Sequence, residues 1–380
     1  MTNLLLPANH RRNQGGFSIV ELMIAIALGL LVLTGLISIF VKNSLARSEI
    51  ERSNRQIESG RYAMSLLTED LRMAGFLSSF NPYDSIVRPN SPPLGPDTAP
   101  ITAAMASMPD PCDASLANLD KSFFFHVQGY DNAGTIPSCV NDARADSDIL
   151  VIRRVSTCVA GPTVEPGCDA VIAGAPYFQA SNCYQATELA KNSGGTAAAK
   201  DYQAYFALDT NTASGMTRHA LDCAAAAEYR RYLTHIYFVA NNSVGTDGIP
   251  TLKRAELGAA GFTIVPLVEG IETMQLEYGV DANDDGAIDG YTTDPGSYNG
   301  CAGANCVLNW LRTYAVNVNL LARNIEKSPG YTDSKTYTLG LKLDGTNNVF
   351  PASGTFADAY KRHAYTAAVR LENPSGRRSP

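Results

Sequence analysis

Residues 17–41 of this 380-residue chain form a continuous apolar run that contains one charged side chain, Glu21. As a helix, a run of this length can cross a hydrocarbon core of about 30 Å. It is too long for the apolar region of an ordinary secretory signal, and no small-x-small cleavage site follows it. The pattern therefore predicts a transmembrane helix that stays in the mature protein. The flanking charges leave its orientation open, because Arg11 and Arg12 precede the run and further basic residues follow it closely.

The helical pattern continues beyond the apolar run, without a proline until Pro82. Apolar or small residues recur every seven positions, and again three positions later, so that they form one stripe on a helix: Ile50, Ile57, Gly60, Met64, Leu67, Leu71 and Ala74. Charged residues occupy the opposite face: Glu49, Glu51, Arg52, Arg55, Glu58, Arg61, Glu69 and Asp70. The pattern predicts an amphipathic half of the helix over 42–80, whose stripe packs on a head domain. From residue 17 to about 76 the helix would be about 90 Å long.

The rest of the chain predicts a globular head over 81–370 and a disordered tail over 371–380. Residues 81–118 are rich in proline and small polar side chains, which favours loop. Stretches rich in β-branched and aromatic residues predict strands at 123–127, 148–155, 234–240, 261–268, 272–280 and 312–322. Alanine tracts at 197–199 and 224–227 indicate short helices. Together these patterns predict an α+β fold, in which a long amino-terminal helix packs on a head with an antiparallel β-sheet and disulfide-rich loops.

The composition favours a structural protein over an enzyme or a nucleic-acid-binding protein. Apolar residues make up 45% of the chain and charged residues 18%, which is enough for a sizeable core outside the membrane. The net charge of −7 disfavours nucleic acid as a partner. The sequence contains no P-loop, no His-Glu-x-x-His motif and no Gly-x-Ser-x-Gly motif. We therefore expect no catalytic site and no required cofactor.

Eight cysteines, all beyond the apolar run, indicate an oxidising compartment such as the periplasm for the head. They are Cys112, Cys139, Cys158, Cys168, Cys183, Cys223, Cys301 and Cys306. The even number allows four disulfides in many connectivities, and close spacing favours Cys301 with Cys306 and Cys158 with Cys168. A zinc site is disfavoured, because no Cys-x-x-Cys pair is present and the five histidines are scattered.

The stretch DANDDGAIDG, residues 281–290, places oxygen ligands at alternating positions. The residues that match the first nine positions of a calcium-binding loop are Asp281, Asn283, Asp285, Gly286 and Asp289. The twelfth position, usually a bidentate glutamate, is Thr292, and this departure would weaken or abolish the site. The alternative is a polar hairpin turn built on Asn-Asp-Asp-Gly. Calcium is thus a candidate ligand, and not a required one.

The start of the apolar run, Gly15-Gly16-Phe17-Ser18-Ile19-Val20-Glu21, resembles the junction of type IV prepilins and type II secretion pseudopilins. The resemblance lies in a glycine, then a phenylalanine, then a glutamate four places on, at the start of a long apolar helix. It implies that a membrane peptidase cuts on the cytoplasmic side between Gly16 and Phe17 and methylates the new amino group of Phe17. The leader is then 1–16, and its loss would change the net charge from −7 to −9, because it removes two arginines.

Glu21 needs a compensating partner if it is buried in lipid. A carboxylate near the middle of a membrane helix is unfavourable by about 2.5–3.5 kcal/mol, and by less near one end. By the same resemblance, Glu21 pairs with the amino terminus of a neighbouring subunit during assembly. The physics is consistent, because the new amine is a cation at the same depth. The alternative is a single-pass anchor with a tolerated glutamate near its end.

Further segments are similar to the PilW family of minor pilins. They are SGRYAMSLLTEDLRMAGF (59–76), DILVIRRV (148–155), HIYFVANN (235–242), LKR (252–254), LVEGIETMQLEYGVDANDDG (267–286) and LRTYAVNVNLLAR (311–323). The similarity runs from the leader to about Arg323, apart from a variable middle over about 81–230. It implies a structural subunit of a complex that primes type IV pilus assembly and caps the tip, with roles in twitching motility and adhesion.

By this resemblance, the chain is an inner-membrane single-pass protein with a periplasmic head before assembly, and a component of the pilus tip afterwards. Its partners would be other minor pilins and the major pilin through the amino-terminal helix, the prepilin peptidase, and a large tip adhesin. Two other functions remain open. One is a minor pseudopilin of a type II secretion system, similar to GspJ, and the other is a stalked adhesin subunit that uses the cysteine-rich middle region.

Overall fold

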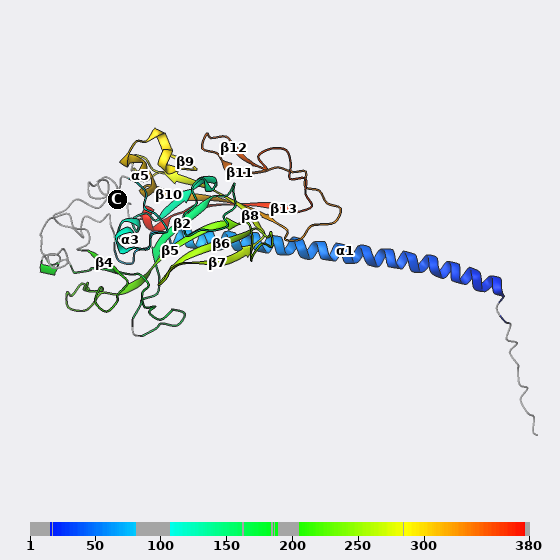
Figure 1. The fold of residues 1–380 in the computed structure, drawn as a ribbon, viewed down its shortest axis with the longest axis horizontal. Helices are drawn as coiled ribbons and strands as arrows, with labels where there is room; N and C mark the ends of the chain where they lie inside the picture. Colours follow the sequence, from blue (N-terminus) through cyan, green and yellow to red (C-terminus); the bar gives the residue numbers. More distant parts are fainter. Residues whose placement is uncertain are drawn as a thin grey trace, which may run out of the picture. The chain divides into compact units, whose positions relative to one another are not determined.

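The computed structural model describes most of the chain (Figure 1). The described residues are 16, 18–80, 107–161, 163–183, 185, 187–188, 205–283 and 285–376. Residues 1–15 of the predicted leader, Phe17 and the predicted helix at 197–199 therefore lie outside the described residues. The chain divides into two compact units, residues 1–52 and 53–380.

One helix, α1 (Ile19–Arg72), contains both hydrophobic patterns. It has 54 residues and confirms the predicted continuity of the helix, but it ends at Arg72, earlier than the predicted bounds of about 76 for the helix and 80 for its amphipathic half. After Arg72 the chain turns at Gly75, whose positive φ of 70° is costly for a residue with a Cβ atom. The Gly75 amide donates to the carbonyl oxygen of Arg153 at 2.9 Å, so the end of the helix is attached to a strand of the head.

The described head contains short helices and two main sheets. The short helices are α3 (Leu116–Ser122), η1 (Asp131–Ala133), η3 (Pro295–Gly300), α5 (Ala304–Leu311) and α6 (Glu372–Gly376). The strands of the large sheet are β1 (Val127–Tyr130), β2 (Ile149–Val155), β3 (Tyr177–Ala180), β4 (Phe206–Asp209), β5 (Tyr229–Ala240), β6 (Thr251–Gly258) and β7 (Gly261–Glu269). The second sheet contains β8 (Ile271–Val280), β9 (Gly290–Thr292), β10 (Thr313–Arg323) and β13 (Arg362–Arg370), and a separate hairpin contains β11 (Tyr337–Leu341) and β12 (Asn347–Phe350).

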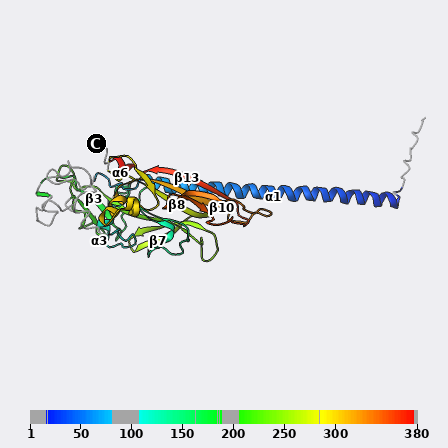
Figure 2. The same cartoon turned by 90° about the horizontal axis from the view of Figure 1, so that it is seen from above.

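All of the strand pairs described are antiparallel. In the large sheet the long strand β5 pairs with β2, β3 and β6, and β7 extends the sheet from β6. The order of the second sheet is β13-β10-β8-β9, and Figures 1 and 2 both show β8, β10 and β13 side by side. The long helix, the antiparallel sheets and the disulfide-bonded loops confirm the predicted α+β fold.

The alternation of side chains along the strands divides the core between the two faces of the large sheet. In β2, Leu150 and Ile152 belong to the main core, whereas Val151 belongs to a smaller cluster on the other face. The main core also contains Leu67 of α1 and Leu320 of β10. The carboxyl-terminal part of α1 therefore shares one core with both sheets.

Gly60 allows α1 to approach β13 closely. A Cβ atom at Gly60 would lie 2.2 Å from Cε2 of Tyr365. Glycine inside a helix costs about 0.5–1 kcal/mol relative to alanine, and the packing of the Tyr365 ring offsets that cost here. One turn earlier, the buried side-chain amide of Gln56 donates to the carbonyl oxygens of Ala322 and Lys361 at 2.9 and 3.0 Å.

Asp70, near the end of α1, attaches the helix to the large sheet through its buried carboxylate. The carboxylate accepts hydrogen bonds from Nε of Arg154 at 2.7 Å, Nδ1 of His235 at 2.6 Å and the hydroxyl of Tyr237 at 2.8 Å. Arg254 in turn donates to the Tyr237 oxygen at 3.1 Å. One carboxylate of α1 is therefore connected to β2, β5 and β6.

The surroundings of Asp70 favour its ionised form. Burial alone would raise the pKa of Asp70, but the hydrogen bond from His235 and the positive charge of Arg154 outweigh burial and hold that pKa well below its usual range. Removal of one member of such a pair leaves a buried charge without compensation. The position of α1 in the head thus depends on this network as well as on apolar packing.

The buried face of α1 differs from the predicted stripe. Gly60 and Leu67 are buried as predicted, but Ile50 and Ile57 are exposed. Asp70, which the pattern placed on the charged face, is only 6% exposed. The prediction failed there because periodicity assigns every charged residue to solvent, whereas Asp70 compensates its burial with three hydrogen bonds.

The strand predictions are confirmed at β2, β5, β7, β8 and β10 and are wrong or missing elsewhere. The predicted strand at 123–127 starts too early, because α3 precedes it and β1 begins at Val127. The alanine tract at 224–227 is not helical, and Ala226 instead forms an isolated bridge with His219. Several strands were not predicted, among them β13, whose alanines and charged residues are unusual in strands.

The predicted loop over 81–118 is too long at its carboxyl-terminal end, because α3 begins at Leu116.

The carboxyl-terminal residues up to 376 also differ from the prediction. The predicted tail over 371–380 begins with an ordered segment, in which Leu371 is buried and α6 follows. The side-chain amide of Asn373 donates to the carbonyl oxygen of Ala74 at 3.3 Å, and this contact fixes the segment to the end of the α1 region.

Replacement of Asp70 by asparagine should lower the free energy of unfolding by about 3 kcal/mol, because it leaves the largely buried charge of Arg154 without its partner. The matched control is Glu69→Gln, which removes an exposed carboxylate from the adjacent position and should change the free energy by less than about 0.5 kcal/mol. Denaturant unfolding of the two variants measures the difference. Equal losses in both variants would contradict the role of Asp70.

The same network predicts a dependence of stability on pH. The pKa of Asp70 is lower in the folded than in the unfolded chain, so its contribution is complete above about pH 5 and is lost as the pH falls toward about 2. The free energy of unfolding of the wild type should therefore decline across this range, and that of Asp70→Asn should decline less steeply. Parallel curves for the two proteins would show that Asp70 is not responsible.

Candidate assembly site

The amino-terminal end of α1 carries a reciprocal cap. The amide of Val20 donates to Oγ of Ser18 at 3.3 Å, and the amide of Ser18 donates to Oε2 of Glu21 at 3.0 Å. This arrangement is a capping box, in which the two side chains satisfy amides that the first helical turn leaves free. A carboxylate at this end is also favoured by the positive end of the helix dipole. Glu21 therefore has a partner within its own chain.

Beyond this cap, α1 exposes a long apolar surface. All side chains of residues 18–47 are exposed, including the large apolar residues Ile19, Leu31 and Phe40. Within the described residues, α1 is the one helix that is long and apolar enough to cross a membrane. An apolar surface of this size requires lipid or a protein neighbour to cover it.

The predicted processing residues lie directly before this surface. Gly16 is exposed, whereas Phe17 lies outside the described residues. Cleavage between Gly16 and Phe17 and methylation of Phe17 therefore stay predictions. Glu21 follows Phe17, the first residue after the predicted cleavage position, by four residues in the sequence.

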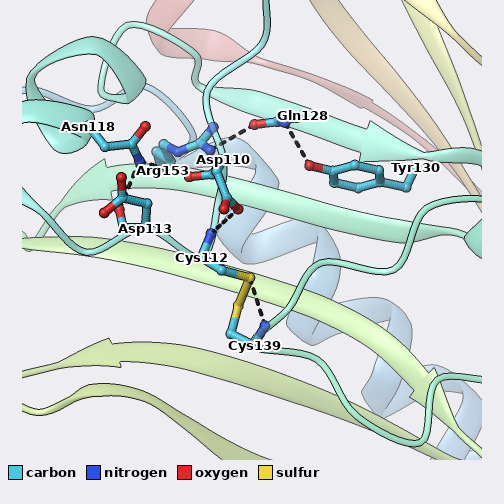
Figure 3. The surroundings of a disulfide bond; sticks show 8 residues. All are labelled: Asp110, Cys112, Asp113, Asn118, Gln128, Tyr130, Cys139 and Arg153. Carbon is cyan, nitrogen blue, oxygen red and sulfur yellow. Dashed lines mark hydrogen bonds between the residues drawn. A yellow bond between two sulfur atoms is a disulfide. The ribbon is translucent and has the colours of Figure 1, made fainter.

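The cysteines form four disulfides in the head. They are Cys112–Cys139, Cys158–Cys168, Cys183–Cys223 and Cys301–Cys306. The two pairs favoured by spacing are confirmed. The bond between Cys112 and Cys139 joins the loop before α3 to the segment after η1 (Figure 3). A crosslink of this kind stabilises irregular segments mainly because it restricts the unfolded chain.

The candidate calcium loop connects β8 to β9 and is closed by its own hydrogen bonds. The fully buried Asp281 accepts the amides of Asp285 and Gly286 at 3.2 and 2.9 Å. Asp289 accepts two backbone amides, at 2.8 and 3.2 Å. The side-chain amide of Asn283 donates to Asp285 and Asp289 at 3.1 and 3.2 Å, so it joins two carboxylates that a bound cation would have to share.

This geometry favours the hairpin-turn alternative. Within the part of the chain that the structure describes, no group of three His, Cys, Asp or Glu side chains is arranged to hold a metal ion. Asp284 of the loop lies outside that part. Calcium binding by Asp281, Asn283, Asp285 and Asp289 is therefore untested, and this geometry leads us to expect a hairpin turn without a bound cation.

Two family models match the sequence. One is described as the prokaryotic N-terminal methylation motif and matches residues 11–37, and the other is PilW, the type IV pilus-assembly protein W, which matches residues 236–373. The resemblance to PilW is confirmed. The PilW match extends from within β5 to within α6 and includes all four strands of the second sheet. The methylation-motif match includes Gly16, Phe17 and Glu21, so the amino terminus is of the prepilin type.

One solved structure with some similarity is the type IV-like pilin TTHA1219 from Thermus thermophilus. It has 13% sequence identity over 38% of this chain and 70% of that chain, with a TM-score of 0.21. A similarity this low carries no argument about the head. No curated protein matches the chain. The relation of the PilW-like chain to pilins therefore depends on its sequence motifs and on α1.

The sequence did not reveal the partners of Asp70. Arg154, His235 and Tyr237 lie 84 to 167 residues away from Asp70 along the chain, so no local pattern connects them. One feature of the sequence did indicate that such partners exist. Arg154 and His235 are polar residues within the apolar runs of predicted strands, and a polar side chain that is buried at such a position requires a hydrogen-bond or charge partner.

Replacement of Asn283 by alanine should lower the free energy of unfolding by about 1 kcal/mol, because Asp285 and Asp289 lose the amide that joins them. Thermal unfolding with a chelator and then with excess calcium measures this effect and tests the cation at the same time. We expect the wild-type midpoint to be equal in both conditions. A calcium-dependent rise in the wild type that disappears in Asp285→Ala would instead establish the loop as a calcium site.

Proposed function

We propose that the chain is a minor pilin, a structural and non-enzymatic subunit of a complex that primes type IV pilus assembly and caps the tip. The observation that carries the proposal is Glu21, a carboxylate at the start of an exposed apolar helix surface, four residues after the junction of a prepilin motif. The PilW match supports a pilus as the assembly.

The first step is processing. Cleavage between Gly16 and Phe17 would create an amino group close to the cap, and amines of this kind are largely protonated near neutral pH. Glu21 follows Phe17 by four residues in the sequence. A neighbouring chain that brings its amine to this carboxylate must therefore be displaced axially relative to it.

The second step is lateral packing. The exposed apolar residues of 18–47 pack against neighbouring helices as the chain leaves the membrane, through contacts that depend little on axial position. The ion pair between Glu21 and a neighbour's amine is directional. In it, two opposite charges in an apolar environment compensate each other. In this mechanism the apolar surface provides adhesion between helices, and Glu21 sets their axial register.

The remaining parts take the places expected of a minor pilin. The head with its four disulfides lies in the periplasm before assembly, an oxidising compartment in which these bonds form. The partners are the prepilin peptidase, other minor pilins, the major pilin and a large tip adhesin.

A second candidate is a minor pseudopilin of a type II secretion system, because residues 15–21 also resemble the junction of that class. A deletion strain separates the two. Loss of twitching motility with intact release of secreted proteins supports the minor pilin, and the opposite pair of phenotypes supports the pseudopilin.

Replacement of Glu21 by glutamine tests the mechanism, because it removes the charge but keeps an acceptor for the Ser18 amide. We expect incorporation into pili to fall at least about tenfold, since loss of one member of a buried ion pair costs about 3–5 kcal/mol. The cleaved protein should persist in the membrane at the wild-type level. Immunoblots of sheared pili and of membranes, with recovery of partner pilins, provide the measurement.

The matched control is Ser18→Ala, which removes the side-chain acceptor of the cap but keeps the Glu21 carboxylate. Its incorporation should stay near the wild-type level. Normal pilus number and normal recovery of partners with Glu21→Gln would show that the charge of Glu21 does not set the register.

A further inference from the structure

A surface cavity of about 700 Å³ lies in the head where five segments meet. The segments are the loop before α3, β1 with η1 and the residues after it, the region of η3, α5, and the turn between β11 and β12. Apolar side chains such as Ile136 and Leu343 line it together with aromatic and acidic residues. The cavity plays no part in the proposed assembly mechanism.

Among the described residues, the charged side chains that line the cavity are all acidic: Asp110, Asp131 and Asp294. The guanidinium of Arg153 lies behind the wall, near Asp110, but at 1% exposure it does not reach the cavity. Neither Asp131 nor Asp294 forms an ion pair within the described residues. The cavity therefore presents uncompensated negative charge.

A buried carboxyl, that of Asp148, lies behind the wall beside Asp131. It accepts the amides of Asn132 and Leu276 at 2.8 and 2.7 Å. Burial raises the pKa of Asp148 well above its usual range, with the charge of Asp131 as a further cause, so the neutral form of Asp148 is favoured. Burial also raises the pKa of Asp131, and the charge of Asp294 adds to that rise. A positive group in the cavity would relieve the repulsion between Asp131 and Asp294.

A buried hydroxyl group beside the acids has no hydrogen-bond partner of ordinary geometry among the described residues. It belongs to Thr293, which lines the cavity, is 6% exposed and lies next to Asp131. Unpaired buried hydroxyls are uncommon, and the Thr293 oxygen can accept a hydrogen bond from a ligand.

Aromatic side chains form a further part of the wall. The side-chain amide of Gln128 donates to the Tyr130 hydroxyl at 3.0 Å, and the Gln128 oxygen accepts from Arg153 at 2.8 Å, which fixes the tyrosine (Figure 3). Trp310 packs against Tyr278 with ring centroids 4.9 Å apart. Aromatic rings attract cations as well as apolar groups.

These features restrict the chemistry of a ligand. A metal ion does not fit, because no three His, Cys, Asp or Glu side chains of the described residues are placed to hold one. An anion would be repelled by the three aspartates. A neutral sugar could stack on the aromatic wall but would leave the carboxylates without compensation.

We propose that this cavity binds an organic cation with a short apolar stem, an alkylammonium group. The ammonium pairs with Asp131 and Asp294, and the Thr293 oxygen accepts one of its hydrogens. The stem packs against the apolar part of the wall, which includes Ile136. A free amine and a lysine side chain of a partner protein share this chemistry.

Trp310 is the only tryptophan of the chain and lines the cavity, so its fluorescence reports on occupancy directly. The full-length protein in detergent micelles is titrated with n-butylammonium and with N-acetyl-lysine methylamide, and calorimetry accompanies the fluorescence. We expect saturable binding that weakens as the salt concentration rises. Tighter binding of the lysine derivative identifies a protein side chain as the source, and tighter binding of butylammonium identifies a free amine.

The double variant Asp131→Asn with Asp294→Asn removes two charges and keeps the hydrogen-bond acceptors. It should bind at least about tenfold more weakly than the wild type. Asp169→Asn is the control, because it removes an exposed carboxylate that does not line the cavity. Thermal unfolding of each variant verifies that the head is folded, and the salt dependence in the wild type provides a test that needs no variant.

Three results would overturn the proposal. They are no saturable response to either cation, equal binding of n-butanol or glucose, and unchanged affinity in the folded double variant. The test is independent of the proposed assembly role, because α1 contributes nothing to the cavity.

Discussion

An ionised carboxylate in an apolar environment requires a positive partner, and the position of Glu21 makes this requirement the basis of the assembly mechanism. Apolar contacts have little direction, so two helices with surfaces like that of residues 18–47 could slide along each other at small cost. One ion pair at a fixed depth removes that freedom. In the single chain, Glu21 instead accepts the Ser18 amide. Its charge therefore has a hydrogen-bond donor in the single chain, and in the proposed mechanism it gains a cation during assembly.

The head follows the same rule in its interior. Asp70 of α1 is buried among donors from the large sheet, and Arg362 of β13 is buried among the carboxylates of Glu272, Asp333 and Asp358. In each case the buried charge has at least one partner of opposite charge, and hydrogen bonds satisfy its polar atoms. Gly60 contributes to the packing, because the absence of a Cβ atom leaves room for the Tyr365 ring. These contacts hold the carboxyl-terminal part of α1 in the core of the head.

The sequence predicted those features that local patterns determine. Continuous helical periodicity predicted α1, short spacing predicted the bonds Cys158–Cys168 and Cys301–Cys306, and apolar runs predicted strands such as β8. Features that depend on distant residues were missed. The burial of Asp70 depends on residues at least 84 positions away, and the acidic cavity brings together aspartates from separate loops. No periodicity records such pairings, because they arise only when the strands have assembled.

The most direct test of the central claim is mass spectrometry of the amino-terminal peptide from protein isolated from cell envelopes. The account requires a free amine on Phe17, four residues before Glu21 in the sequence, since that amine is the proposed partner of the carboxylate of the next chain. It predicts a peptide that begins with methylated Phe17. A peptide that still begins at Met1, with no cleavage before Phe17, would contradict the account.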